Sequence, residues 1–123
     1  MHVQHDETST PDPRSRLVEG RLEGSLCASC GYRLAGTAPR CPVCGGELAA
    51  ALFGPEGVVW ARTTLRVPVQ ERSVPYILAY VDLDDGPRVL AHVDADPEQP
   101  PSVGARVRLS ATTPEGDLSV SLL

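Results

Sequence analysis

Small or aliphatic side chains recur at every second position along most of the chain after residue 49. The alternation runs through GVVWARTTLRVPV (57–69), PYILAYVDLD (75–84) and RVLAHVDA (88–95), and it continues in SVGARVRLS (102–110) and DLSVSLL (117–123). A period of two is typical of a β-strand, because successive side chains of a strand point to opposite faces. Glycine and proline separate the segments, as turns require. The sequence therefore predicts five strands between residues 49 and 123.

The parity of the alternation predicts which side chains face the interior of the domain. This predicted inward set is Val59, Ala61, Thr63, Leu65, Val67, Ile77, Ala79, Val81, Leu83, Val89, Ala91, Val93, Val103, Ala105, Val107, Leu109, Leu118, Val120 and Leu122. The opposite face then carries aromatic, basic and imidazole side chains, namely Trp60, Arg62, Arg66, Tyr80 and His92.

The connections between the strands narrow the architecture. Around Asp84-Asp85-Gly86, the apolar faces of two neighbouring strands stay together only if the loop has three or five residues rather than two. A longer irregular connection, DADPEQPP (94–101), joins the third strand to the fourth. Five strands with one long connection favour a small Greek-key barrel of the OB type. An SH3-like barrel or the edge of a sandwich is the alternative.

The first part of the chain divides differently. Residues 1–13 are rich in Ser, Thr, Asp and Pro without apolar periodicity, which predicts a disordered tail. RSRLVEGRLEGSL (14–26) predicts a short helix that breaks at Gly20, followed by a strand that leads into Cys27. The predicted organisation is thus a tail (1–13), a lead-in with a cysteine module (14–48) and an all-β domain (49–123).

All four cysteines lie in CASCGYRLAGTAPRCPVCGG (27–46), as two Cys-x-x-Cys pairs that are each followed by glycine. Such a turn points two thiolates at one centre and leaves backbone amides free to donate to the sulfurs. Two turns complete a tetrahedral site whose predicted ligands are Cys27, Cys30, Cys41 and Cys44. A module of this size cannot fold on an apolar core alone, so it needs a metal or crosslinks. The sequence therefore predicts that residues 14–48 contain a rubredoxin-like zinc ribbon.

The chemistry of this module has alternatives. Four thiolates leave no open position for water, so a bound metal is expected to be structural. Zinc is the default metal, and iron is the alternative because both turns also resemble the iron-binding knuckles of rubredoxin. Redox use of one Cys-x-x-Cys pair would explain neither the second pair nor the repeated glycine. Disulfides are disfavoured for a chain expected in the reducing cytoplasm.

Composition and charge exclude some classes of function. No run of eighteen apolar residues exists, and the polar, acidic start lacks the order of a secretory signal, which indicates a cytoplasmic protein without a membrane span. The net charge of −5 argues against nucleic acid, whose binders carry a basic face. All basic side chains are arginine, which we interpret as the codon bias of a GC-rich bacterial genome.

The order of a two-knuckle ribbon and a barrel resembles the acyl-CoA-associated family catalogued as domain of unknown function 35 (DUF35). The resemblance rests on EGRLEGSLCASCG, PRCPVCGGEL, GVVWARTT, PYILAYVDLDDGPRVLAHV and VGARVRL, which together run from Glu19 to Leu109. It implies a zinc-binding, non-catalytic accessory subunit of an enzyme that acts on acyl-CoA thioesters. The partner would be a thiolase, a ketosynthase-like condensing enzyme, a hydratase or an aldolase. The alternatives are a single-stranded nucleic-acid binder and a free-standing redox or iron protein.

The residues themselves offer no catalytic constellation. The cysteines are all assigned to the metal, and the serines lie in no nucleophile turn. His2 and His5 fall in the predicted tail, and His92 has no acid partner by motif. The acidic run at Asp84-Asp85 is best explained as a turn. An accessory role is therefore expected rather than an enzyme.

Two surfaces are candidates for binding. Trp60, Arg62, Arg66, Tyr80 and His92 are predicted to lie together on the outer face that OB domains use for ligands. Stacking and guanidinium–phosphate pairing there would suit the nucleotide of a CoA thioester, and burial against the ribbon or a partner is the alternative. The second surface is the ribbon loop GYRLAGTAPR (31–40), in which Tyr32, Leu34 and Arg40 would contact a partner. A solvated hairpin tip is the alternative for this loop.

Overall fold

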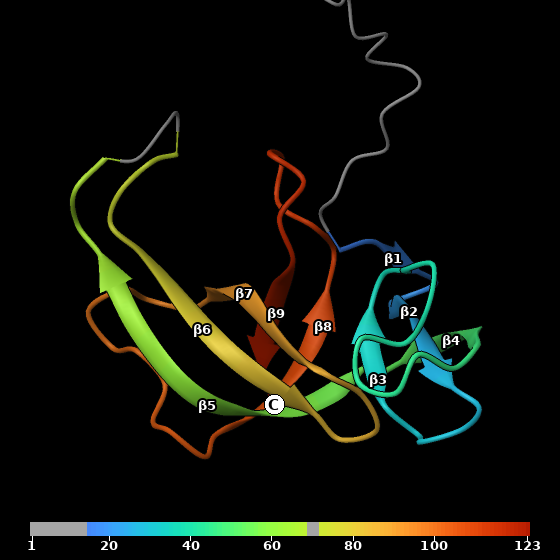
Figure 1. The fold of residues 1–123 in the computed structure, drawn as a ribbon. Helices are drawn as coiled ribbons and strands as arrows, with labels where there is room; N and C mark the ends of the chain where they lie inside the picture. The colour runs from blue at the N-terminus through green and yellow to red at the C-terminus, as the bar shows by residue number, and fades with distance from the viewer. Residues whose placement is uncertain (1–14, 69–71) are drawn as a thin grey trace, which may run out of the picture.

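The computed structural model describes residues 15–68 and 72–123, which form strands and turns without any helix (Figure 1). The strands are β1 (Leu17–Val18), β2 (Arg21–Cys27), β3 (Arg33–Ala35), β4 (Leu48–Phe53), β5 (Glu56–Leu65), β6 (Tyr76–Leu83), β7 (Arg88–Asp94), β8 (Arg106–Ser110) and β9 (Ser119–Leu122). The predicted all-β class is therefore confirmed. The predicted tail lies outside the described residues, and the described part contains no helix long and apolar enough to cross a membrane.

The predicted short helix before Gly20 is wrong, whereas the predicted strand that leads into Cys27 is confirmed as β2. In place of the helix, β1 forms a hairpin with β2, in which Leu17 pairs with Leu22 and Val18 pairs with Arg21. Glu19 and Gly20 form its two-residue turn with φ values of 52° and 79°, which is the geometry of a tight hairpin turn. Gly20 thus reverses the chain between two strands rather than ending a helix.

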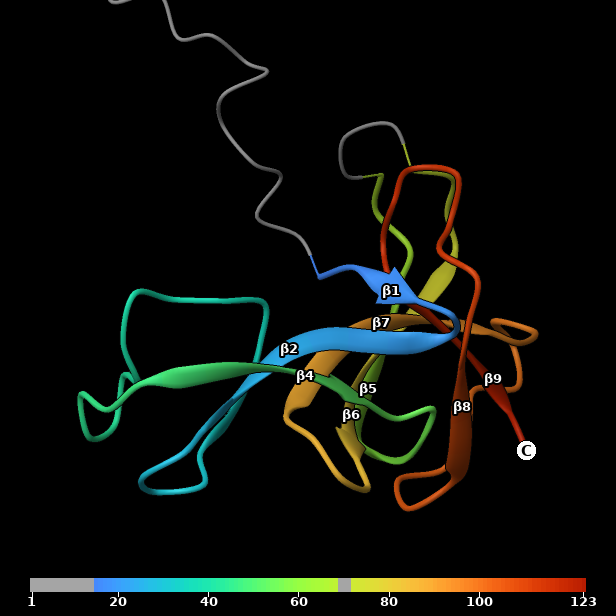
Figure 2. The ribbon, with the colours of Figure 1, turned by 90° about the vertical axis from the view of Figure 1, so that its right-hand side faces the viewer.

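The strands β1 to β4 form the ribbon sheet, with β2 at its centre. Antiparallel β1 and β3 pair with one side of β2, and β4 pairs with the other side along its whole length, from Leu22↔Phe53 to Cys27↔Leu48. Figure 2 shows β2 and β4 running side by side. The predicted boundary between residues 48 and 49 therefore falls at the start of a strand that is hydrogen-bonded to the ribbon.

The strands β5 to β9 close into a barrel in the order β5-β6-β7-β9-β8. All neighbouring pairs are antiparallel except β7 and β9, and β8 closes the barrel against β5. In the hairpin of β6 and β7, Asp82 pairs with Arg88 and the Leu83 N–H donates to the Pro87 carbonyl at 3.4 Å, which leaves the three residues 84–86 as the loop. The predicted five-stranded OB-type barrel and the odd loop length are both confirmed.

The barrel interior contains most of the predicted inward side chains. Those that are buried as predicted are Val59, Ile77, Ala79, Val81, Leu83, Val89, Ala91, Val93, Val107, Leu109, Leu118 and Val120. Val103 and Leu122 are exposed instead, because Val103 precedes β8 and Leu122 lies at the last position of β9.

A β-bulge interrupts the register of β5. Val59 pairs with Val81, whereas Ala61 pairs with Tyr80, so Trp60 is an additional residue with no partner of its own on β6. A bulge of one residue reverses the parity of everything that follows it on that strand.

The predicted facing of the second half of β5 is consequently wrong. Arg62 lies opposite buried Ala79, on the inward side of the strand, whereas Thr63 lies opposite Leu78 on the outer side. Leu65 follows Thr63 on that outer side, and Val67 is exposed beyond the end of the strand.

One apolar core joins the ribbon sheet to the barrel. Leu22 of β2 and Phe53 of β4 belong to the same buried cluster as the barrel side chains. The Phe53 ring fits because two glycines leave room for it: a Cβ on Gly24 would lie 2.8 Å from the ring, and a Cβ on Gly86 would lie 2.6 Å from Phe53 Cβ. The Asp85 side chain accepts a hydrogen bond from the Gly54 N–H at 2.7 Å beside this contact. The ribbon is therefore held to the barrel by packing as well as by the chain.

Candidate metal centre and outer barrel face

The two cysteine turns have the same backbone geometry. In the first, the Gly31 N–H donates to the Cys27 carbonyl at 3.0 Å; in the second, the Gly45 N–H donates to the Cys41 carbonyl at 2.9 Å. Both glycines have positive φ, at 79° and 78°, which a residue with a Cβ rarely adopts. The glycine after each Cys-x-x-Cys pair is thus required by the turn that aims the two sulfurs.

The four sulfurs converge on one point between the turns. Their Sγ atoms all lie within 4.8 Å of one another, with Cys27 and Cys44 at 3.5 Å and Cys30 and Cys41 at 3.7 Å. A tetrahedral ion with Zn–S bonds of about 2.3 Å requires S···S distances of about 3.8 Å. The arrangement therefore fits a four-coordinate zinc or iron ion without rearrangement of the turns.

Backbone amides stabilise thiolates in this cluster. The N–H groups of Cys30 and Ser29 each donate to Cys27 Sγ at 3.4 Å, and the Val43 N–H donates to Cys41 Sγ at the same distance. Against the opposing effect of burial, these bonds lower the pKa of the Cys27 thiol to about 6. The pKa of Cys41 is lowered as well. Against a hydrogen bond from the backbone, burial and the neighbouring cysteine sulfurs raise the pKa of Cys30 to about 12, so without a cation the four thiols do not all ionise together. A bound metal requires deprotonated thiols and would supply the charge that stabilises them.

The ribbon loop projects from the metal cluster. Tyr32 is 42% exposed and precedes β3, in which Leu34 is half-buried against Ser25 of β2. Arg40 is exposed and donates to the Gly45 carbonyl at 3.4 Å. Arg40 also lines an open hollow of about 500 Å³ at the start of β4. Two of the three predicted contact residues of this loop, Tyr32 and Arg40, are thus accessible.

The outer face of the barrel brings together only part of the predicted ligand set. Trp60 and Tyr80 form an edge-to-face pair with centroids 6.2 Å apart, and both are about half exposed, at 51% and 46%. The Arg88 guanidinium lies over the Trp60 ring at 3.6 Å and also pairs with Asp82. Beside them Leu90 is exposed and borders a shallow apolar pocket of about 320 Å³ with Tyr80.

Arg62 and Arg66 do not join this aromatic pair. Because of the bulge, Arg62 turns to the long loop before β8 and its Nε donates to the Pro101 carbonyl at 3.0 Å. Arg66 pairs with Glu98 of the same loop at 3.1 Å, on the surface. These two arginines contact the loop, and Arg62 also lines the shallow pocket that Tyr80 and Leu90 border.

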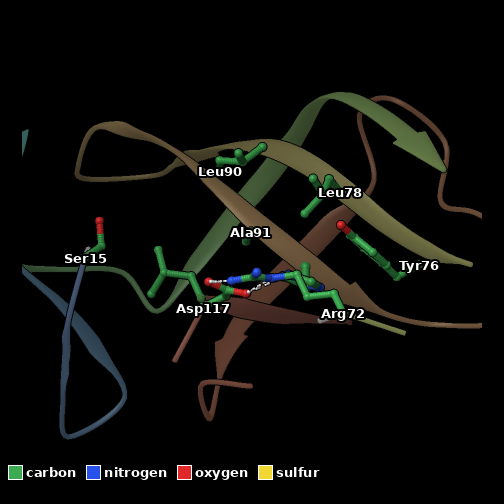
Figure 3. Close-up of a pocket in the computed structure, with 9 residues that line it drawn as sticks. Ser15, Arg72, Tyr76, Leu78, Leu90, Ala91 and Asp117 are labelled. Carbon is green, nitrogen blue, oxygen red and sulfur yellow. Dashed lines mark hydrogen bonds and ion pairs between the residues drawn. The ribbon is translucent and has the colours of Figure 1, made fainter. Parts of the chain in front are cut away.

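His92 lies at the other end of the outer face, in a pocket of about 280 Å³ (Figure 3). Its ring stacks on Tyr76 with centroids 4.9 Å apart, and its Nε2 lies 3.1 Å from Asp117 Oδ2. Arg72 donates two hydrogen bonds to the same carboxylate, at 2.8 and 3.0 Å, and Figure 3 shows this pairing at the floor of the pocket. His92 thus has an acid partner in Asp117, which no motif of the sequence indicates.

This network keeps Asp117 ionised. Hydrogen bonds from Arg72 hold the pKa of the Asp117 carboxyl below its usual range, and the charge of His92 acts in the same direction. With an ionised carboxylate opposite Nε2, that nitrogen carries the proton. Leu78, Leu90 and Leu118 form the apolar walls above it.

The sequence did not identify Arg72, Asp117 and Arg88 as members of these sites. Arg88 follows from hairpin pairing, because it lies opposite Asp82 across the loop. Asp117 and Arg72 come from separate connections, 45 residues apart, and no local pattern relates them.

Residues 51–112 match the family model of the ChsH2 C-terminal OB-fold domain. A DUF35 domain-containing scaffold protein of Methanothermobacter thermautotrophicus is 33% identical over 82 residues, which cover 63% of this chain and 62% of the relative. A DUF35 domain-containing scaffold protein of Pyrococcus furiosus is 39% identical over 83 residues, or 64% of this chain and 60% of the relative. The chain thus spans about six tenths of the length of these curated relatives.

Solved structures show the same fold. An Ltp2–ChsH2(DUF35) aldolase matches with a TM-score of 0.68 and 24% identity, over 83% of this chain and 84% of that one. A DUF35-family protein of unknown function from Sulfolobus solfataricus matches with a TM-score of 0.62 and 17% identity, over 84% and 76%. Together with the matched family model and the two scaffold relatives, these findings show that the chain belongs to the DUF35 OB-fold family.

Proposed function

We propose that this protein is a non-catalytic, zinc-binding accessory subunit of an enzyme that acts on acyl-CoA thioesters. The observation that carries the proposal is the similarity to two DUF35 proteins named as scaffolds. The fold neighbour that combines a DUF35 protein with an aldolase supports an enzyme as partner. An aldolase, a thiolase, a ketosynthase-like condensing enzyme and a hydratase are the candidates, and the role is to assemble the complex and to assist acyl-CoA binding or transfer.

The composition of the metal site supports a structural rather than a catalytic role for a bound ion. Zinc bound by Cys27, Cys30, Cys41 and Cys44 would have four protein ligands and no position left for a substrate or water. What it would supply is rigidity in the loop between the two turns, where Tyr32 and Arg40 are exposed. We propose this loop and the Trp60–Tyr80 pair as partner-contacting surfaces.

The charges on the barrel support CoA binding at a shared interface rather than by this chain alone. Arg88 pairs with Asp82, and Arg106 pairs with Asp84 and Glu56. Guanidinium groups that are already paired with carboxylates offer little to a phosphate. Apart from Arg62, which bonds to a backbone carbonyl, cations of the partner would therefore have to hold the nucleotide of CoA. The same pairing disfavours single-stranded nucleic acid, which needs an unpaired basic groove.

Co-expression tests the proposal. The tagged full chain is expressed with each thiolase, condensing enzyme, hydratase or aldolase encoded beside its gene, and the mixture is analysed by size exclusion with light scattering. A stable complex and a gain in the partner's acyl-CoA turnover are expected. The variant Val43→Ala, in the second cysteine turn, serves as a control and should behave like the parent. Separate elution from every candidate, or acyl-CoA turnover by this chain alone, would contradict the proposal. Binding of a labelled single-stranded oligonucleotide at physiological salt would favour the alternative.

A further inference from the structure

The pocket around His92 has no part in the proposed function, yet it combines apolar walls with a polar floor. Three leucine side chains form its walls, and the paired Arg72 and Asp117 lie at its floor (Figure 3). Its volume is about 280 Å³, just below the range of about 300 to 1,000 Å³ that is typical of small-molecule sites. The pocket is therefore of a size for a compound with a single ring rather than for an extended ligand.

The polar floor of the pocket is fixed by its own backbone contacts. The Asp117 N–H donates to Thr113 Oγ1 at 3.0 Å, and the Thr113 N–H donates back to the Asp117 carbonyl at 2.9 Å. The His92 N–H donates to the Leu118 carbonyl at 2.8 Å, which extends the pairing of β7 with β9 as far as the pocket. A ligand would therefore not have to order these groups when it binds.

The charges of the pocket cancel each other. Both oxygens of the Asp117 carboxylate accept hydrogen bonds from Arg72, and one of them also faces His92 Nε2. The arginine and aspartate side chains are only 20% and 18% exposed. A charged ligand would lose its hydration here without gaining an opposite charge of its own. The pocket is therefore suited to an uncharged ligand.

Two uncharged polar atoms remain for a ligand to bind. Because His92 Nε2 carries its proton toward Asp117, His92 Nδ1 is an acceptor, and it has no hydrogen-bond partner among the described residues. The Tyr76 hydroxyl also has no partner there, and Figure 3 shows it pointing into the pocket. The described part of the chain contains no side-chain N or O atom that is both buried and unpartnered, so both atoms are accessible.

The complement of these two atoms is a hydroxyl group. The rings of His92 and Tyr76 stack with centroids 4.9 Å apart, so the acceptor and the phenol belong to adjacent side chains. A ligand hydroxyl can donate to an imidazole nitrogen and accept from a phenol, whereas a carbonyl can only accept.

We propose that this pocket binds an uncharged monocyclic alcohol. The ring lies between the leucine side chains, and the hydroxyl donates to His92 Nδ1 and accepts from the Tyr76 hydroxyl. Anions and cations of the same size are excluded, because the Arg72–Asp117 pair leaves no charge to meet them. The site belongs to this chain alone and does not depend on the proposed partner enzyme.

Titration of the full chain with cyclohexanol, followed by amide NMR, tests the site. A dissociation constant on the order of 1 mM is expected for so small a ligand, with shifts at the amides of Ala91, His92 and Leu118 and none at Gly31. Cyclohexanecarboxylate and cyclohexylamine have the same ring and should bind at least about tenfold more weakly, since each would bury an uncompensated charge. Equal binding of either charged compound would overturn the proposal, as would the absence of shifts up to about 10 mM cyclohexanol.

Two tyrosine variants test the position of the hydroxyl. Tyr76→Phe keeps the ring stack and removes an unpartnered hydroxyl, so it should weaken cyclohexanol binding by about three- to tenfold and leave the melting temperature unchanged. Tyr80→Phe is the matched control, because Tyr80 lies on the same face of β6 but does not line this pocket. Equal loss in both variants, or shifts centred on Trp60, would place the alcohol on the open surface and refute the proposal. Loss of partner-enzyme binding with Tyr76→Phe, without alcohol binding by the parent, would assign the pocket to that enzyme instead.

Discussion

Removal of the metal should unfold the ribbon and leave the barrel folded. Between residues 28 and 47 the only buried side chain is that of Cys41, a metal-ligand candidate. This segment therefore has no apolar core that could offset the entropy of ordering its chain. The barrel, by contrast, contains most of the buried cluster. We expect Cys41→Ser or a strong chelator to release residues 28–47 from their fold.

The magnitude follows from the geometry of the site. The S···S distances of 3.5 and 3.7 Å fit a zinc ion without rearrangement, so the full apparent affinity of about 10 to 16 kcal/mol for structural zinc is available to folding. This affinity is as large as the whole free energy of unfolding of a typical domain, which is about 5 to 15 kcal/mol. A loss of only about 4 kcal/mol would already accelerate amide exchange about a thousandfold.

Hydrogen exchange with and without metal measures this effect amide by amide. The N–H groups of Gly31 and Gly45, which close the two turns, should lose protection by three orders of magnitude or more, while Val81 in the barrel keeps its rate. Val43→Ala changes a 65% exposed side chain in the same turn and should leave both patterns intact. Protection at Gly31 and Gly45 that survives chelation, or less than half an equivalent of zinc plus iron in fresh protein, would refute the reasoning. A red, absorbing preparation would identify iron.

Three further outcomes are expected. Phe53→Ala should lower the free energy of unfolding in urea by about 3 to 5 kcal/mol, because the ring is 4% exposed in the shared core; an effect no larger than that of exposed Leu52→Ala would contradict this. The lowered pKa of Asp117 stabilises the fold above pH of about 4 and loses this effect as pH falls, so Asp117→Asn should flatten the acid limb of unfolding free energy against pH. Arg62→Ala should lower stability by about 1 to 3 kcal/mol through its lost bond to a buried carbonyl; lost CoA affinity with unchanged melting temperature would support a ligand role instead.

The periodic pattern was sufficient to predict the barrel, because burial on one face imposes a period of two wherever strands are regular. It failed at Trp60, where one additional residue reverses the parity of β5. A bulge is set by the pairing of two strands and leaves no mark in the sequence of one. The assignment of Arg62 to the outer face was wrong for this reason.

The helix predicted before Gly20 was wrong for a different reason, although the strand predicted after it is present as β2. Leu17, Val18 and Leu22 fit a short amphipathic helix as well as a hairpin, since both place apolar residues together over so few positions. The hairpin forms because β2 gains partners on both sides. Tertiary pairing thus decided between two local solutions.

The two candidate sites differ in how far local sequence determines them. Each cysteine turn is complete within five residues, so spacing and glycine suffice to predict it. His92 on β7 contacts Asp117 from the loop before β9 and Tyr76 from the neighbouring strand β6. Only the closed barrel brings these three residues together. A site whose residues come from distant segments has no characteristic spacing in the sequence, so it cannot be predicted from a local motif.

The joint between ribbon and barrel bears on how such a chain could act as a scaffold. A metal held by the four cysteines would order the ribbon loop, and Phe53, which lies between Gly24 and Gly86, joins the ribbon sheet to the barrel. Because that contact lies in the buried cluster rather than in a linker, we expect the loop near Tyr32 and the Trp60–Tyr80 pair to keep a fixed separation. A partner that contacts both surfaces would then bind without the entropic cost of fixing one surface relative to the other. A low cost of this kind is what allows two small contacts to give stable binding. Enlarging Gly86 to alanine should therefore weaken a two-surface partner more than a ligand of either surface alone.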